Sequence, residues 1–247
     1  MTKALLLAVL LVSPLALTAQ RGNRSPTQAA FPFLHANNLV LFQGDSITDG
    51  GRARQGTDQN HIMGQDYAYI VAAELGVDIP ERNIRFVNRG ISGERVPDLA
   101  ARWEQDTLAL KPDVLSILIG VNDMLAAGSR FVSAEEYEAQ YDKLLAQTIA
   151  ALPGTRIVLG EPFLLPVGKM KASYDAQLVE MKKRQAIVAK LGVKYRLPVV
   201  RYQQAFDAVL AKAPAEHWVW DGIHPTYAGH GLMAREWLRT TNAAWGM

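Results

Sequence analysis

The chain has 247 residues, 49% of them hydrophobic and 20% charged, and is therefore long enough to bury a full core as one α/β domain. Its 26 Lys and Arg against 24 Asp and Glu give a formal net charge of +2. The basic residues are scattered, so nothing in the sequence predicts nucleic-acid binding. The chain contains no cysteine, which excludes disulfides and a thiol-linked lipid anchor.

The N-terminal segment has the pattern of an export signal followed by a linker. Met1-Thr2-Lys3 gives a basic start, and the apolar run Ala4 to Ala19 ends in small residues that suit cleavage. This run is shorter than the ~20 residues of a comfortable membrane span, although an uncleaved membrane anchor is the alternative. We expect a secreted or periplasmic protein without stable membrane insertion after cleavage, organised as signal peptide 1–19, linker 20–36 and domain 37–247.

Strand and helix signals alternate through the rest of the chain. Apolar runs predict strands at 38–42, 84–87, 114–119, 156–159 and 198–201. Capping residues, periodic apolar positions and Gly or Pro stops predict helices at 67–75, 97–110, 133–152, 169–191, 203–211 and 226–240. Strands separated by helices imply a mostly parallel five-stranded sheet covered on both faces. The expected fold is therefore a three-layer α/β/α, flavodoxin-like domain.

Four polar blocks stand out against this pattern. Three of them directly follow predicted strands: Gly44-Asp45-Ser46-Ile47-Thr48-Asp49, Asn88-Arg89-Gly90-Ile91-Ser92-Gly93 and Gly120-Val121-Asn122-Asp123. The fourth, Asp221-Gly222-Ile223-His224-Pro225, precedes the last predicted helix. The carboxyl ends of parallel strands form the edge where an open α/β sheet binds ligands. We therefore expect the blocks to meet at one site on that edge.

Ser46, His224 and Asp221 are the residue types needed for acyl transfer through an activated hydroxyl. A free serine is a poor nucleophile at neutral pH, so Ser46 needs a base, and His224 can take its proton and return it to the leaving alcohol. Asp221 lies three residues before His224, so its carboxylate can accept from the imidazole Nδ1–H in a tight loop. An isolated Asp-x-x-His pair is more often a surface turn or a helix cap, but the presence of Ser46 and two further polar blocks in the same chain favours a catalytic role.

The four blocks, in this order, resemble those of the SGNH (GDSL) hydrolase family and extend from Gly44 to Pro225. Three longer strings of this sequence further resemble the branch of the family that includes acetylxylan esterases. These are Leu41-Phe42-Gln43-Gly44-Asp45-Ser46-Ile47-Thr48-Asp49, Ala101-Arg102-Trp103-Glu104 and Leu115-Ser116-Ile117-Leu118-Ile119-Gly120-Val121-Asn122-Asp123. Related sequences can act on other acetylated sugars, so the resemblance implies an ester hydrolase without fixing its substrate.

The family pattern also implies an oxyanion hole for the tetrahedral intermediate. Its donors would be the backbone N–H of Ser46, the backbone N–H of Gly93 and the side-chain amide of Asn122, each worth roughly 3–4 kcal/mol of barrier. Gly90 is the alternative to Gly93, although Ile91-Ser92-Gly93 matches the motif better. Structural roles are open as well, because glycine is common in turns and asparagine often closes a loop.

Asp45 and Asp123 flank these positions, and local hydrogen bonds to backbone N–H groups are their expected role. The remaining histidines, His35, His61, His217 and His230, show neither an HExxH pattern nor a clustered ligand spacing. The sequence therefore predicts no catalytic metal, and the chemistry needs no cofactor.

Tryptophans supply the clues to substrate binding. Trp220 lies just before Asp221 and can stack on a sugar ring, and Trp103 on the predicted helix 97–110 can reach the Gly93 side. Tryptophans in general serve packing more often than ligand contact. Tyr67, Met124 and Phe163 occupy positions from which side chains could narrow an acyl pocket to the size of acetyl.

The favoured interpretation is a serine esterase that removes acetyl groups from an O-acetylated carbohydrate through an acyl-enzyme. A lysophospholipase or acyl thioesterase is the alternative among hydrolases, because specificity depends on the pocket. A non-catalytic sugar-binding protein is the alternative from another class. A homo-oligomer is compatible with the sequence.

Overall fold

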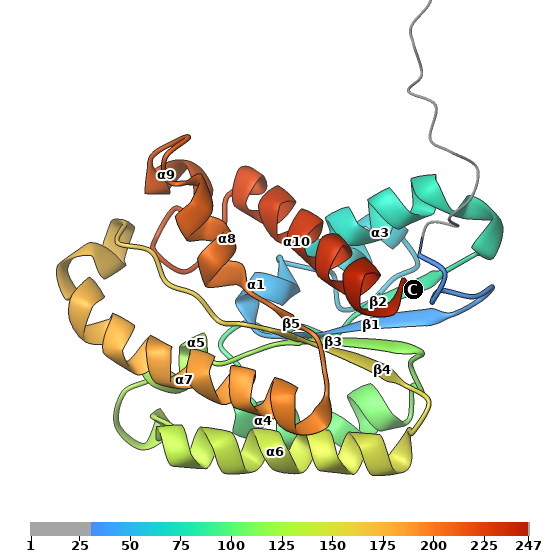
Figure 1. Cartoon of the computed structure of the whole chain (residues 1–247), viewed down its shortest axis with the longest axis horizontal. Helices are drawn as coiled ribbons and strands as arrows, with labels where there is room; N and C mark the ends of the chain where they lie inside the picture. The colour runs from blue at the N-terminus through green and yellow to red at the C-terminus, as the bar shows by residue number, and fades with distance from the viewer. Residues whose placement is uncertain (1–30, 247) are drawn as a thin grey trace, which may run out of the picture.

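A five-stranded parallel sheet lies between two layers of helices (Figure 1). The computed structural model describes residues 31–246. The strand order is β2-β1-β3-β4-β5, and every neighbouring pair runs parallel. This is the flavodoxin-like order, so the predicted three-layer α/β/α fold is confirmed. The strands are β1 (Leu39–Gly44), β2 (Arg85–Asn88), β3 (Val114–Leu118), β4 (Arg156–Gly160) and β5 (Val199–Val200).

The helices divide between the two faces of the sheet (Figure 1), with α4, α6 and α7 on one face and α3, α8 and α10 on the other. Among residues 31–246, no helix combines the length and the apolar character that a membrane crossing requires. The helices are α1 (Ser46–Asp49), α2 (Gln59–Met63), α3 (Tyr67–Asp78), α4 (Val96–Trp103), α5 (Val121–Leu125), α6 (Ala134–Ala151), α7 (Tyr174–Tyr195), α8 (Tyr202–Val209), α9 (Ala215–Trp218) and α10 (Tyr227–Trp245).

Each face of the sheet has its own hydrophobic core. All residues of β1 and β3 are buried, as expected for strands covered on both sides. On the α10 side, Phe42 packs against Tyr67 and Trp237, whose ring centroids lie 5.9 and 5.7 Å away. The Trp237 Nε1–H donates to Ser116 Oγ at 3.0 Å, so this large side chain also satisfies its polar atom.

The predicted helix caps are present, but several predicted helix ends are wrong. The helix predicted to end at 110 ends as α4 at Trp103, and the one predicted to end at 240 runs as α10 to Trp245. Asp66 accepts a hydrogen bond from the Tyr69 N–H, and Ser133 accepts one from the Glu136 N–H. The helices continue, however, through the glycines expected to stop them, so that α7 runs past Gly192. A Cβ at Gly192 would lie 2.5 Å from Val199 Cγ2, so this glycine allows close packing between helix and strand instead of ending the helix.

The folded domain starts earlier than the predicted residue 37. Phe33 and Leu34 are buried in the core, and Arg82 Nη1 donates to the carbonyl oxygen of Leu34 at 3.0 Å. Two buried apolar side chains and a long-range hydrogen bond attach this segment to the domain, so residues 31–36 are not linker. The predicted signal peptide 1–19 and the linker residues 20–30 lie outside the described residues.

Candidate active site

The three predicted catalytic side chains meet at the carboxyl edge of the sheet. Ser46 begins α1 directly after β1, and Asp221 and His224 lie in the loop before α10. Ser46 Oγ lies 2.8 Å from His224 Nε2, and His224 Nδ1 lies 2.8 Å from Asp221 Oδ2. The hydroxyl, imidazole and carboxylate therefore form one hydrogen-bonded chain. In this arrangement His224 can take a proton from Ser46 while Asp221 fixes the tautomer.

Asp45 holds the turn that presents Ser46. It is the N-cap of α1, and its Oδ1 accepts from the Ile47 N–H at 3.0 Å. Burial raises the pKa of Asp45 to about 7, because the carboxyl group is only 1% exposed. Asp123 also accepts from a backbone N–H, that of Val96 at 3.0 Å, and so joins the third polar block to the start of α4. The Asp45 contact agrees with the local role expected of this residue, whereas the Asp123 contact is long-range in sequence.

Asp221 is fixed by more contacts than the triad alone requires. Its Oδ1 accepts from the backbone N–H groups of Ile223 and His224, at 3.0 and 2.8 Å. Lys169 Nζ lies 3.0 Å from Oδ2, the oxygen that faces the His224 ring. Lys169 escaped the sequence analysis because it lies far earlier in the chain. No local pattern links it to Asp221.

These contacts lead to a prediction for stability at low pH. Burial opposes ionisation of Asp221, but hydrogen bonds from His224, Ile223 and Lys169 outweigh it and lower the pKa from 3.8 to about 2. A carboxyl group with a lowered pKa in the folded state stabilises that state above pH ~4, and this contribution is lost as the pH falls towards 2. Between pH 4 and 2, the free energy of unfolding should therefore fall more steeply in the wild type than in Asp221→Asn. Urea unfolding at constant ionic strength measures both slopes, and parallel curves would contradict the prediction.

Two backbone N–H groups are available as oxyanion donors. Gly93 has φ +82°, a conformation that favours glycine, and within the described chain its N–H has no acceptor. The alternative, Gly90, already donates its N–H to Asn88 Oδ1 at 2.8 Å. The geometry therefore favours Gly93 over Gly90. The Ser46 N–H, in the first position of α1, also has no acceptor within residues 31–246.

The amide of Asn122 is positioned by the loop that carries Gly93. Asn122 Nδ2 donates to the carbonyl oxygen of Glu94 at 3.1 Å. The Glu94 carboxylate is in turn held by Arg102, with Nη2 2.5 Å from Oε2. One amide hydrogen of Asn122 is used in this contact, and the second remains for an oxyanion.

A buried acidic residue that the sequence analysis did not single out holds the same loop. Asp49 Oδ2 accepts from the Ser92 N–H at 2.9 Å, from Ser92 Oγ at 2.8 Å and from Arg54 Nη2 at 2.7 Å. Asp49 ends α1, the helix that begins with Ser46. It therefore links the serine turn to the Gly93 loop, and its place in the first polar block was the only sequence signal.

The two tryptophans predicted to bind substrate have different environments. Trp220 is 61% exposed and stacks on His224, with ring centroids 5.6 Å apart and an interplanar angle of 20°. Trp103 is 1% exposed, and its Nε1–H donates to Thr148 Oγ1 at 2.9 Å. The prediction for Trp103 is therefore wrong, because α4 turns this side chain into the core under α6.

A small cavity lies against the oxyanion donors. Its volume is about 280 Å³, and its lining includes Gly93 and Asn122 together with Ala126, Ala127 and Arg130. Tyr67, Met124 and Phe163, which were expected to narrow an acyl pocket, are buried in the core instead. Small side chains after α5 therefore shape this cavity.

Comparison with known proteins adds to this geometry. Residues 42–232 match the model of the GDSL-like lipase/acylhydrolase family, a range that includes all three triad residues. An acetylxylan esterase from Geobacillus stearothermophilus is 37% identical over 213 residues, which cover 83% of this chain and 94% of that enzyme. A solved structure of an acetylxylan esterase from the same organism has a TM-score of 0.75 at 36% identity, covering 84% of this chain and 95% of that chain.

A protein from Parabacteroides merdae ATCC 43184, described as GDSL-like lipase, is also similar in structure. Its TM-score is 0.80 at 39% identity, and the match covers 85% of this chain and 97% of that chain. The chain thus aligns with nearly the whole length of each of these proteins.

Proposed function

The chain belongs to the GDSL-like lipase/acylhydrolase family, and on that premise we propose that it is a serine esterase that removes acetyl groups from an O-acetylated carbohydrate. The observation that carries the proposal is the hydrogen-bonded chain from Ser46 through His224 to Asp221, together with a Gly93 N–H that has no acceptor among residues 31–246. The triad supplies a nucleophile and its base, and the N–H can donate a hydrogen bond to the developing charge.

The first half of the reaction acylates the enzyme. Ser46 Oγ attacks the acetyl carbonyl carbon while its proton moves to His224 Nε2, and the carbonyl oxygen becomes an oxyanion. The N–H groups of Ser46 and Gly93 and the Asn122 amide donate to that oxygen. When the intermediate collapses, the bond to the sugar oxygen breaks, the sugar hydroxyl leaves with the proton from His224, and acetyl-Ser46 remains.

The second half uses the same groups for hydrolysis. Water attacks the acetyl carbon of acetyl-Ser46 and gives its proton to His224, and a second oxyanion forms in the same place. Collapse releases acetic acid and returns the proton from His224 to Ser46 Oγ. Asp221 stabilises the imidazolium in both halves without itself being protonated.

Asn122→Ala tests the role of the third donor. The substitution should lower kcat by roughly 10²–10³ with a smaller change in KM, because an oxyanion donor acts mainly in the transition state. Steady-state kinetics on p-nitrophenyl acetate measures both constants. Asn242→Ala, which alters an exposed residue near the C-terminal end of α10, should match the wild type. An effect confined to KM would instead make Asn122 a ground-state binding residue.

The assignment to acetylated carbohydrate rests on the acetylxylan esterase that is 37% identical over most of its length. Two features of the site support it. The cavity beside Gly93 and Asn122 includes Arg130, whose cation disfavours a long apolar acyl chain, and the exposed ring of Trp220 next to His224 is available to a sugar. An acetate-release screen across acetylated xylan, pectin, glucomannan and chitin fragments tests the substrate class, and no release from any of them would contradict the proposal.

A lysophospholipase or acyl thioesterase is the second candidate, because the triad cleaves any activated acyl group. Long acyl chains require an extended apolar groove, whereas the cavity beside the oxyanion donors includes the cation of Arg130. Rates on p-nitrophenyl acetate, butyrate and octanoate separate the candidates. The proposed esterase should prefer acetate, and a preference for octanoate would favour the second candidate. A non-catalytic sugar-binding protein would release no acetate. Acetate release that a serine-directed inhibitor abolishes would therefore exclude this third candidate.

Export of the protein is part of the same proposal. The basic start and the apolar run up to Ala19 support a cleaved secretory signal. If the full chain is expressed in a host with the appropriate export pathway, the mature protein should accumulate outside the cytoplasm and lack its first residues. N-terminal sequencing of the exported protein measures the cleavage site, and a retained, uncleaved chain would contradict export.

A further inference from the structure

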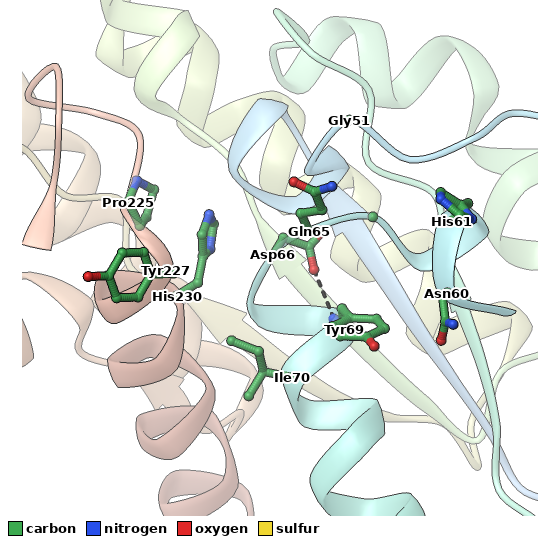
Figure 2. A pocket seen from close by; sticks show the side chains of 11 residues that line it. Gly51, Asn60, His61, Gln65, Asp66, Tyr69, Ile70, Pro225, Tyr227 and His230 are labelled. Atoms are coloured by element: carbon green, nitrogen blue, oxygen red, sulfur yellow. Dashed lines mark hydrogen bonds between the residues drawn. The ribbon is translucent and has the colours of Figure 1, made fainter.

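A second, larger cleft lies between the N-terminal ends of α3 and α10 (Figure 2). Its volume is about 650 Å³. Tyr227 and His230 come from α10, Gln65 and Asp66 come from the segment that leads into α3, and Asn60 comes from α2. The mechanism above uses none of these side chains.

The cleft lies next to the loop that carries His224. Pro225, which directly follows His224, forms part of its wall, and so does Gly51, close behind α1. The residues beside the oxyanion donors line a different cavity. Because His224 delivers the proton to the departing alcohol, the oxygen of the leaving sugar must lie beside the His224 ring, next to the wall that Pro225 forms. The cleft is therefore placed to receive the carbohydrate and not the acyl group.

The lining of the cleft is suited to an uncharged ligand. Its described residues include neither Lys nor Arg. Its one carboxyl group, Asp66, is 1% exposed and already accepts from Tyr69 N–H and Asn88 Nδ2, both at 2.9 Å. Burial raises the pKa of Asp66 to about 8 and lowers that of His230 to about 4, so both side chains are largely uncharged at pH 7. His61 also lines the cleft, and its Nδ1 lies 2.5 Å from Asp58 Oδ2. The cleft therefore offers no Lys or Arg cation to an anionic ligand.

Several polar groups in the cleft have no partner in the protein. Within residues 31–246, the side-chain amides of Asn60 and Gln65 make no hydrogen bond, and the buried Nδ1 of His230 has no partner either. Most buried polar atoms in folded proteins are paired, so the unpartnered Nδ1 of His230 calls for an explanation, whereas the amides of Asn60 and Gln65 are exposed. Two free amides and an imidazole nitrogen give the cleft both donors and acceptors.

Two tyrosines add flat apolar surfaces next to these polar groups. Tyr227 is 87% exposed at the first position of α10, and Tyr69 lines the opposite wall (Figure 2). A tyrosine presents an apolar ring face with a polar tip. A sugar ring has the complementary surface, because its C–H faces are apolar and its rim carries hydroxyl groups. Apolar walls with a few convergent polar groups are typical of small-molecule sites.

We propose that this cleft is a subsite for an uncharged sugar ring of the carbohydrate chain, next to the acetylated ring and on the leaving-group side of Ser46. The inference rests on the proposed function, because it takes the leaving group to be a carbohydrate. In the subsite, a ring packs on Tyr227, and its hydroxyl groups bond to the amides of Asn60 and Gln65. Oligosaccharides should therefore bind better than single sugars.

Binding can be tested without hydrolysis by using Ser46→Ala protein and unacetylated oligosaccharides. Isothermal titration with xylotetraose, cellotetraose and mannotetraose measures Kd, and at least one of the three should bind more tightly than its monosaccharide. Adding Tyr227→Ala should weaken that binding about ten-fold through the lost stacking contact. Adding Asn60→Ala should weaken it by roughly three- to ten-fold through a lost hydrogen bond.

A matched control is Tyr195→Ala in the same background. Tyr195 ends α7, which returns the chain to the opposite edge of the sheet before β5, so its removal should leave Kd unchanged. The side chains of Tyr227 and Asn60 are exposed and lie on different helices. Thermal unfolding should therefore show that each variant is folded, and a change in Kd then reports on the subsite and not on folding. The subsite is overturned if none of the three oligosaccharides binds, or if neither substitution weakens binding.

The outcome is separable from the test of the proposed function. Acetate release is measured on acetylated substrates with active enzyme, whereas the subsite is measured on unacetylated ligands with inactive enzyme. Tyr227-dependent binding without acetate release would retain the sugar site and reject the esterase. Acetate release without Tyr227-dependent or Asn60-dependent binding would retain the esterase and reject the subsite.

Discussion

Replacing Ser46 with alanine should reduce acetate release to the uncatalysed background. In the proposed mechanism the hydroxyl oxygen bonds to the acetyl carbon, and this oxygen lies 2.8 Å from His224 Nε2. Without it, the remaining oxyanion donors can assist only direct attack by water. Loss of a triad nucleophile typically costs roughly 10⁴–10⁶ in kcat. The test compares the rates at which the wild type and Ser46→Ala hydrolyse p-nitrophenyl acetate. The variant is used at a concentration well above that of any contaminating esterase.

The variant should remain folded, because one oxygen atom is removed and the α1 cap by Asp45 is unaffected. Thermal unfolding within a few degrees of the wild type would establish this. Ser129→Ala, which alters an exposed serine, should retain the full rate. If folded Ser46→Ala kept more than trace activity, another group would be the nucleophile.

Asp221→Asn should produce the second large loss, about 10⁴ in kcat. One side-chain oxygen can still accept from the N–H groups of Ile223 and His224, which preserves the loop. The new NH₂ group, however, would face both the His224 Nδ1–H and the Lys169 ammonium, which are donors. The imidazole would then adopt the tautomer that carries the proton on Nε2 and could not accept one from Ser46.

A double-variant cycle decides whether Asp221 acts through His224. Asp221→Asn combined with His224→Ala should be little slower than His224→Ala alone, because residues that act as a unit have non-additive effects. Asp142→Asn, which breaks an exposed ion pair with Lys194, is the matched control and should leave kcat unchanged. If the losses from Asp221→Asn and His224→Ala multiplied, Asp221 would act independently, and the dyad would have to be abandoned.

The alternation of strands and long helices along the chain was predictable because the sequence signals for each element are local. The apolar run around Leu41 is buried on both faces, and Asp66 and Ser133 cap the helices that follow them. The triad was predictable for a similar reason. Ser46 and His224 each lie in a block whose neighbours, Asp45 and Asp221, bond within two or three residues.

Features that depend on distant parts of the chain were not predictable. The spacing of Leu99 and Trp103 indicates an apolar helix face, but only the position of α6 places Trp103 against Thr148. Short helices such as α5 have too few residues for a periodic pattern. The contact of Lys169 with Asp221 depends on how the segment before α7 crosses the edge of the sheet. No propensity or spacing contains that information.

The separation of Ser46 and His224 along the chain has a consequence for biosynthesis. The two residues are 178 positions apart, and the sheet that brings them together is built entirely from parallel pairs, which require long connections. A growing chain that has not reached residue 224 has a serine without its base and is chemically silent. With the proposed triad as catalyst, turnover appears only once residue 224 has been made and has packed beside Ser46, which makes turnover a direct measure of folding across the whole sheet.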